Sequence, residues 1–172
     1  MKPLILIACC ALIACKEEVA TAPPAPVAMT EAALSHFCQM NVLEHGGPKG
    51  QIHLEGHPSP LFFAQVRDLV TYVKSPERVA DMEAIYVSDM GMADSWRYPG
   101  AENWIDAEQA VYVVGSNVAG GMGAPEIVPF SDAQSAQGFI DQYGGQLHAL
   151  ADIPEDAVLG PVDLDAPLET PL

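Results

Sequence analysis

Basic residues are scarce in this chain. Seven Lys and Arg stand against 23 Asp and Glu, which gives a formal net charge of −16. A surface of this charge repels the phosphates of nucleic acids and the headgroups of anionic lipids. We therefore expect no nucleic-acid partner. The same charge attracts cations, but it does not select among them.

The apolar run at the start of the chain is too short to cross a bilayer. It covers residues 3–14, PLILIACCALIA, after the positive Lys2. A spanning helix needs about 20 apolar residues, whereas a shorter run of this kind is typical of a secretory signal. The run ends in LIAC, which resembles a bacterial lipobox. We therefore predict a lipoprotein signal peptide over residues 1–14 and lipidation of Cys15, with a plain secretory signal or an uncleaved anchor as alternatives.

Free cysteine is scarce as well. Cys9 and Cys10 leave with the predicted signal and Cys15 is acylated, so only Cys38 remains as a thiol. The compartments that receive exported proteins favour disulfide bonds. An unpaired cysteine there indicates intermolecular pairing, a reactive thiol or a metal ligand. The chain has no C-x-x-C for thioredoxin-like chemistry and no G-x-S-x-G for a hydrolase triad.

Composition divides the mature chain into three parts. Residues 15–32 are rich in Ala and Pro, and we interpret them as the lipid anchor and an extended tether of about 3 Å per residue. Residues 151–172 hold six acids, no base and four prolines. We interpret them as a disordered acidic tail. Residues 33–150 between them are enough for one hydrophobic core.

Apolar periodicity predicts an α+β fold made of two ββαβ units in one compact domain. The two units cover about residues 33–92 and 104–150. Ser131 is the expected N-cap of the second helix, and Gly144 is its expected stop. The expected elements are strands 36–44 and 51–56, helix 60–75 and strand 82–90, followed by strands 109–116 and 126–130, helix 131–143 and strand 144–150.

The stretch HFCQM carries the candidate metal ligands. On a strand, His36, Cys38 and Met40 point to one face about 6.5–7 Å apart, close enough for two flexible side chains to share an ion. On a helix they would diverge, so the spacing supports a shared site only in a strand or a turn. Thiolate and thioether are soft ligands that favour Cu(I). Structural zinc prefers four Cys or His ligands, and a blue-copper site needs a second His.

Other methionines add to this pattern. Met90 and Met92 lie beside a glycine just after a predicted strand, and Met122 lies between glycines in a loop. We take Met90 and Met122 as further candidate copper ligands, with Met92 and His36 as alternatives. The plainer interpretation is that these methionines fill gaps in the core.

The motifs taken together resemble one family. The lipobox and the strings FCQM, GPKGQ, YVSDMG, WIDAEQAVYVVGS, GGMGAPE, PF and YGG follow in this order. This ordered set resembles the NosL family, lipoprotein copper chaperones for nitrous-oxide reductase assembly in denitrification. The resemblance covers about residues 36–150. It implies paired ββαβ units and a Cys-x-Met pair for Cu(I), here Cys38 and Met40. Many members have glycine between these two ligands, where this chain has Gln39.

The resemblance also implies a function and partners. We expect a periplasmic, membrane-anchored Cu(I) carrier that has no catalytic residues. Its expected acceptor is nitrous-oxide reductase, for the catalytic copper–sulfide cluster, and it would work beside a membrane transporter complex of the same assembly system. Lys16 follows the lipobox, so no Asp indicates inner-membrane retention and the choice of membrane stays open. The alternatives are an assembly scaffold without metal and an enzyme that uses Cys38 as nucleophile.

Overall fold

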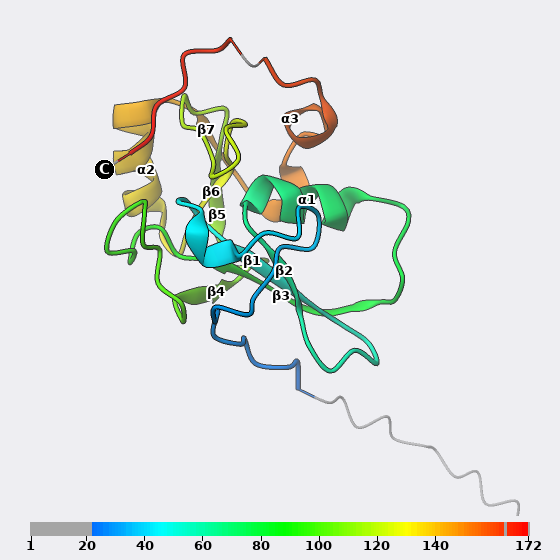
Figure 1. Cartoon of the computed structure of the whole chain (residues 1–172). Coiled ribbons are helices and arrows are strands. Elements are labelled where there is room, and N and C mark those ends of the chain that lie inside the picture. Colours follow the sequence, from blue (N-terminus) through cyan, green and yellow to red (C-terminus); the bar gives the residue numbers. More distant parts are fainter. Residues whose placement is uncertain (1–21, 164, 172) are drawn as a thin grey trace, which may run out of the picture.

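The computed structural model describes residues 22–163 and 165–171. The predicted signal peptide and Cys15 lie outside these residues. The described chain forms two antiparallel sheets with a helix packed on each (Figure 1). The first unit contains β1 (Gly50–Leu54), β2 (Leu61–Phe63), α1 (Val66–Lys74), β3 (Met82–Ser88) and β4 (Trp104–Asp106), and the second contains β5 (Val111–Val114), β6 (Val128–Phe130), α2 (Ala133–Tyr143) and β7 (Gln146–His148).

The two sheets share one topology, which confirms the α+β prediction. The strand order is β2-β1-β3-β4 in the first sheet and β6-β5-β7 in the second. In each unit the first strand lies between the second and the third, and the helix connects the second to the third. The second unit follows the predicted order strand–strand–helix–strand element by element. The first unit has the same order but is built from other residues than predicted, because β2 lies within the predicted helix and no strand forms at 36–44. β4 is an addition that the periodicity did not indicate.

Several element boundaries differ from the prediction. Residues 36–44 form a turn and a short 3-10 helix, η1 (Val42–Glu44), and not a strand. The stretch expected to begin the first helix pairs with β1 as β2, and α1 starts only at Val66. Asp132, not Ser131, caps α2, because its carboxylate accepts the N–H of Ser135. Gly144 ends α2 at φ 73, as predicted.

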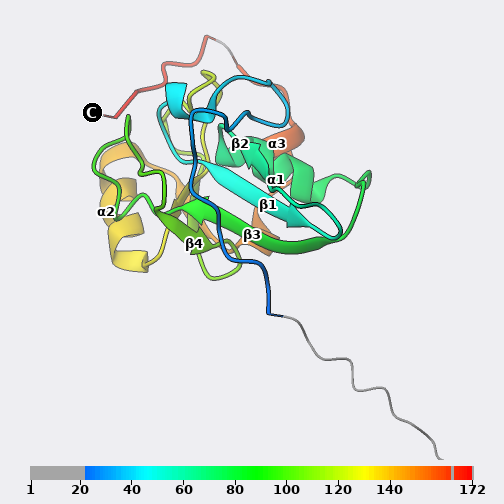
Figure 2. The same cartoon turned by 60° about the horizontal axis from the view of Figure 1, so that its bottom comes forward.

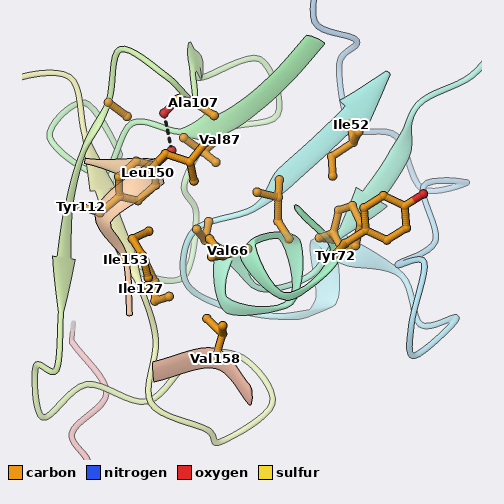
Figure 3. Packing of buried hydrophobic residues seen from close by; sticks show 14 of the residues in the cluster. Ile52, Val66, Tyr72, Val87, Ala107, Tyr112, Ile127, Leu150, Ile153 and Val158 are labelled. Carbon is orange, nitrogen blue, oxygen red and sulfur yellow. Dashed lines mark hydrogen bonds between the residues drawn. The ribbon is translucent and has the colours of Figure 1, made fainter. Parts of the chain in front are cut away.

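One core joins the two units into a single domain. Ile52 and Val87 from the first sheet and Val66 from α1 pack in the same buried cluster as Tyr112 of β5 (Figure 3). The buried Tyr112 hydroxyl has a hydrogen-bond partner, since it donates to the carbonyl of Ala107 at 2.7 Å. A second cluster, built around Trp96, lies between the second sheet and α2.

The segment before the domain is packed against it, which corrects the prediction of a free tether for its described part. Figure 2 shows the blue N-terminal segment crossing the first sheet. Val27 exchanges two hydrogen bonds of 2.9 Å with the side chain of Gln51, and Pro24 accepts one of 2.7 Å from the Tyr86 hydroxyl. Met29 is only 4% exposed. Sequence composition missed this because the partners lie more than 20 residues away.

The C-terminal segment is also part of the fold, not a disordered tail. It forms η2 (Leu150–Asp152) and α3 (Asp156–Leu159), and Ile153 and Val158 are buried in the main core. The Arg67 guanidinium donates to the carbonyls of Val158 and Gly160. Leu150, Ile153 and Val158 thus bury apolar surface in a segment that is otherwise rich in acids, and this burial favours docking. In the part of the chain described, no helix combines the length and apolarity needed to cross a bilayer.

Candidate metal-binding site

Cys38 and Met40 lie in one tight turn, residues 34–41. The N–H of Ser35 donates to the carbonyl of Met40 at 2.9 Å, and the N–H of Gln39 donates to the carbonyl of Ser35 at 2.8 Å. The strand face predicted for His36, Cys38 and Met40 is therefore wrong, because the chain reverses direction between them. A turn can also bring side chains two residues apart to the same region, so a site shared by Cys38 and Met40 stays a prediction.

The turn is anchored to the end of β2. The N–H of His36 donates to the carbonyl of Phe62 at 2.7 Å, and the Ser35 hydroxyl accepts the N–H of Ala64 at 3.2 Å. Ser35 is fully buried. The backbone of the turn is thereby held by two bonds to a sheet strand, and this limits the positions that the Cys38 thiol can take.

Gln39 adopts a left-handed backbone with φ 58, alone among the non-glycine residues described. Glycine is favoured in this conformation because a Cβ crowds the backbone. The Gln39 side chain compensates by donating to two carbonyls of the turn, that of His36 at 2.8 Å and that of Ser35 at 3.3 Å. The resemblance leads us to expect glycine at this position, and Gln39 takes a backbone conformation that glycine adopts readily.

The surroundings of the thiol are apolar and partly open. Cys38 is half-buried and unpaired, and it packs against the small cluster of Met29, Ala33, Val42 and Ala64. Several large apolar side chains nearby in sequence are more exposed than is usual for a core. They are Leu34 (49%), Phe37 (49%), Met40 (40%) and Leu43 (39%). The two sulfur donors are thus reachable from solvent.

Met122 lies at the tip of a hairpin loop whose contacts are with His45, just after η1, and with Gln65, just before α1. Residues 118–126 form the loop, which is closed by hydrogen bonds such as the one from Gly120 N–H to the Ala124 carbonyl at 2.8 Å. The Gly121 carbonyl lies 3.2 Å from Nδ1 of His45, which follows η1 directly. The Met122 side chain is 43% exposed. The hairpin tip is therefore attached to the segment that continues from Cys38 and Met40.

Met90 and Met92 lie elsewhere. Met90 packs in the Trp96 cluster of the second sheet, and its N–H donates to the carbonyl of Pro129 at 3.0 Å. Met92 is 74% exposed in the following turn. Gly91 between them approaches Ser135 of α2. Met90 is therefore committed to the core of the second unit, and Met92 follows it in the chain.

His36 is engaged with aromatic rings. It meets Phe63 and Tyr72 edge to face, with ring centroids 5.8 and 5.4 Å apart. Across residues 22–163 and 165–171, no three His, Cys, Asp or Glu side chains come together as a metal site. Hard oxygen-preferring ions and structural zinc therefore lack a ligand set in this region, whereas a thiol with thioethers suits a soft ion.

Two buried ionisable residues near the turn were not singled out from the sequence, although both fall in motifs that carry the resemblance. Lys49 of GPKGQ is 1% exposed, and its ammonium donates to three carbonyls, including that of Ala64 at 3.1 Å. Burial lowers the pKa of Lys49 to about 8. Glu126 of GGMGAPE is also 1% exposed, and burial raises its pKa to about 8. Lys49 thereby links the turn at Gly46 and Gly47 to Ala64, at the junction between β2 and α1.

The fold and the turn define a small α+β binding domain whose reachable donors are a thiol and thioethers. The chain belongs to the NosL family, whose sequence profile matches residues 26–158. It is 54% identical over 93% of its length to the "Copper-binding lipoprotein NosL" of Achromobacter cycloclastes, of which it covers 83%. The protein of the same name from Stutzerimonas stutzeri is 33% identical over 77% of this chain and 67% of its own.

A solved structure supports the same assignment. The crystal structure of "the copper chaperone NosL from Shewanella denitrificans" superposes with a TM-score of 0.72 and 34% identity. The superposition covers 77% of this chain and 98% of that one. The relatives are named as copper-binding and chaperone proteins, in agreement with the expectation of a carrier and not an enzyme.

Proposed function

We propose that this protein is a periplasmic, lipid-anchored Cu(I) chaperone that delivers copper to nitrous-oxide reductase. The observation that carries the proposal is the turn that holds Cys38 and Met40 together, half-buried and reachable, in a chain whose relatives are named for copper binding. A thiolate and a thioether match the soft character of Cu(I), and the thiolate neutralises its charge.

Met122 is the third ligand that we favour. Its hairpin contacts His45, five residues after Met40, whereas Met90 packs in the Trp96 cluster. Its exposed side chain is long and flexible, so it can adjust to an ion bound at the Cys38 turn. An ion held by two or three soft ligands keeps an open side, where a ligand of the acceptor can attack and take the copper over.

In this proposal the lipid on Cys15 serves to anchor the protein. It confines the donor to a membrane surface beside the transporter complex of the assembly system and raises the local concentration of both. The names of the two curated relatives include the word lipoprotein, which supports this anchor.

Anaerobic competition for Cu(I) against a chromogenic chelator tests the proposal. The protein would begin at Lys16, and wild type would be compared with Cys38→Ser and, as a matched control, Met92→Leu. We expect one Cu(I) per chain in wild type and in the control, and its loss with Cys38. Equal binding by wild type and Cys38→Ser would contradict the proposed site, and no binding by wild type would favour the metal-free scaffold.

A further inference from the structure

The two ββαβ units exchange hydrogen bonds at the start of α1. Gln65 occupies the N-cap position, but its side chain does not cap its own helix. The cap comes from the second unit: Oε1 of Glu126 accepts the N–H of Arg67 at 3.0 Å and that of Ile127 at 2.9 Å. Glu126 thus satisfies a backbone donor of the first turn of α1 from 59 residues away.

The side chain of Gln65 is turned toward the Met122 hairpin instead. Its carbonyl oxygen accepts the N–H of Met122 at 3.2 Å, and the side chain is only 3% exposed. Ala64, the preceding residue, is the one whose N–H is bound by Ser35 in the Cys38 turn. The β2–α1 junction therefore holds the Cys38 turn with one residue and the Met122 hairpin with the next.

Gly120 leaves room for this arrangement. A Cβ placed on Gly120 would lie 2.4 Å from Oε1 of Gln65 and 2.5 Å from Oε2 of Glu126. Both oxygens therefore occupy the space beside Gly120 that a side chain would need. Oε2 of Glu126 is buried and has no hydrogen-bond partner among the described residues. A side chain at position 120 would push these two groups and the hairpin apart.

We propose that Gln65 and Glu126 are positioning residues for copper exchange, which orient the Met122 hairpin toward the turn that carries Cys38 and Met40. This inference rests on the proposed function, because it takes Met122 as a copper ligand. Glu126 holds the start of α1 in place, Gln65 transmits that position to the backbone of Met122, and Gly120 lets both groups approach. The three residues together set how readily the third ligand reaches the ion.

The rate at which Cu(I) leaves the protein measures this role. Loaded protein would be mixed anaerobically with excess chelator, and wild type compared with Gln65→Leu, Met122→Leu and the double variant. We expect Gln65→Leu to speed Cu(I) loss by about 2- to 10-fold, the net worth of one hydrogen bond. In the Met122→Leu background the same substitution should add nothing, because it acts through Met122.

Two further variants separate positioning from general destabilisation. Thr71→Val removes a hydrogen bond within α1 that does not touch the hairpin, and it should leave the rate unchanged. Glu126→Gln keeps an acceptor for both backbone N–H groups and offers a donor to Gln65, so it should retain the wild-type rate, whereas Glu126→Leu should not. In the apo-protein, Gln65→Leu should also speed amide hydrogen exchange at Met122.

The outcomes separate this inference from the proposed function. An unchanged rate in Gln65→Leu, or an equal acceleration with and without Met122, overturns the positioning role while copper binding stands. A wild-type rate in Met122→Leu overturns it as well. A wild type that holds no Cu(I) refutes the proposed function itself, and unchanged amide exchange at Met122 in apo Gln65→Leu then refutes the positioning contact independently.

Discussion

The N–H of Ser35 donates to the carbonyl of Met40 at 2.9 Å and closes the turn that carries Cys38. Ser35 itself is buried and its hydroxyl accepts the N–H of Ala64. The thiol therefore sits on a loop whose two ends are held together and whose base is fixed to β2. Such a loop presents donors with little conformational freedom to lose on metal binding.

Gln39 allows a test of how the turn is held. Gln39→Ala should lower the free energy of unfolding by about 1 kcal/mol, because it keeps the strained φ and loses the side-chain hydrogen bonds. Gln39→Gly should be more stable than Gln39→Ala by about 1 kcal/mol, since it relieves the strain. Urea unfolding of the three proteins measures both differences. Equal stability of the alanine and glycine variants would contradict the left-handed backbone.

The methionines should separate into ligands and structural residues. Met122→Leu should weaken Cu(I) binding by about tenfold or more, which corresponds to about 1.4 kcal/mol. Met90→Leu should leave Cu(I) affinity unchanged, because Met90 packs in the Trp96 cluster. Chelator competition and thermal unfolding on the same preparations measure the two properties. A loss of affinity in Met90→Leu at unchanged stability would return Met90 to the ligand set.

Glu126 predicts a pH dependence of stability. Burial raises its pKa from 4.5 to about 8, so the folded protein keeps a proton that the unfolded chain releases between these pH values. The contribution of Glu126 to the free energy of unfolding is therefore full below pH 4.5 and falls as pH rises toward 8. Glu126→Gln has no such titration. The free energy of unfolding of wild type, relative to that of Glu126→Gln, should therefore fall from pH 5 to pH 7.5, as measured by urea unfolding.

Met29 tests whether the N-terminal segment belongs to the fold. Its side chain is buried in the cluster against which Cys38 packs. Met29→Ala should lower the free energy of unfolding by about 2–4 kcal/mol, the usual cost of a cavity of this size. Val79→Ala, at a residue 78% exposed, is the control and should change little. A neutral Met29→Ala would restore the interpretation of this segment as a free tether.

Ile153 tests the docking of the C-terminal segment in the same way. It is 2% exposed within the main core. Ile153→Ala should lower the free energy of unfolding by about 2–4 kcal/mol. Leu159→Ala is the matched control, since Leu159 is 57% exposed on α3. Equal effects of both substitutions would mean that the segment is not packed in solution.

Local pattern was a good guide where neighbours in sequence decide the structure. The strands and helix of the second unit and the stop at Gly144 depend on short-range sterics and on apolar periodicity, so the order of that unit was predicted correctly. In the first unit the same signals identified β1, α1 and β3 but not β2. The soft donors Cys38 and Met40 could be recognised because ligand chemistry belongs to the side chain itself. The prediction of a strand was wrong at residues 36–42, HFCQMNV, because this sequence suits a strand or a turn equally well.

Sequence by itself therefore determined the class of fold, the order of elements in the second unit and the type of metal that its donors suit. Tertiary structure decided the remainder. The turn at Cys38 is held because Ser35 and His36 find partners at the end of β2. The Met122 hairpin is held by Gln65 and His45, while Met90 packs in the Trp96 cluster. The segments around Met29 and Ile153 pack on the domain because these two residues find apolar surroundings made by distant residues. Contacts of this range leave no periodic signal in the chain that forms them.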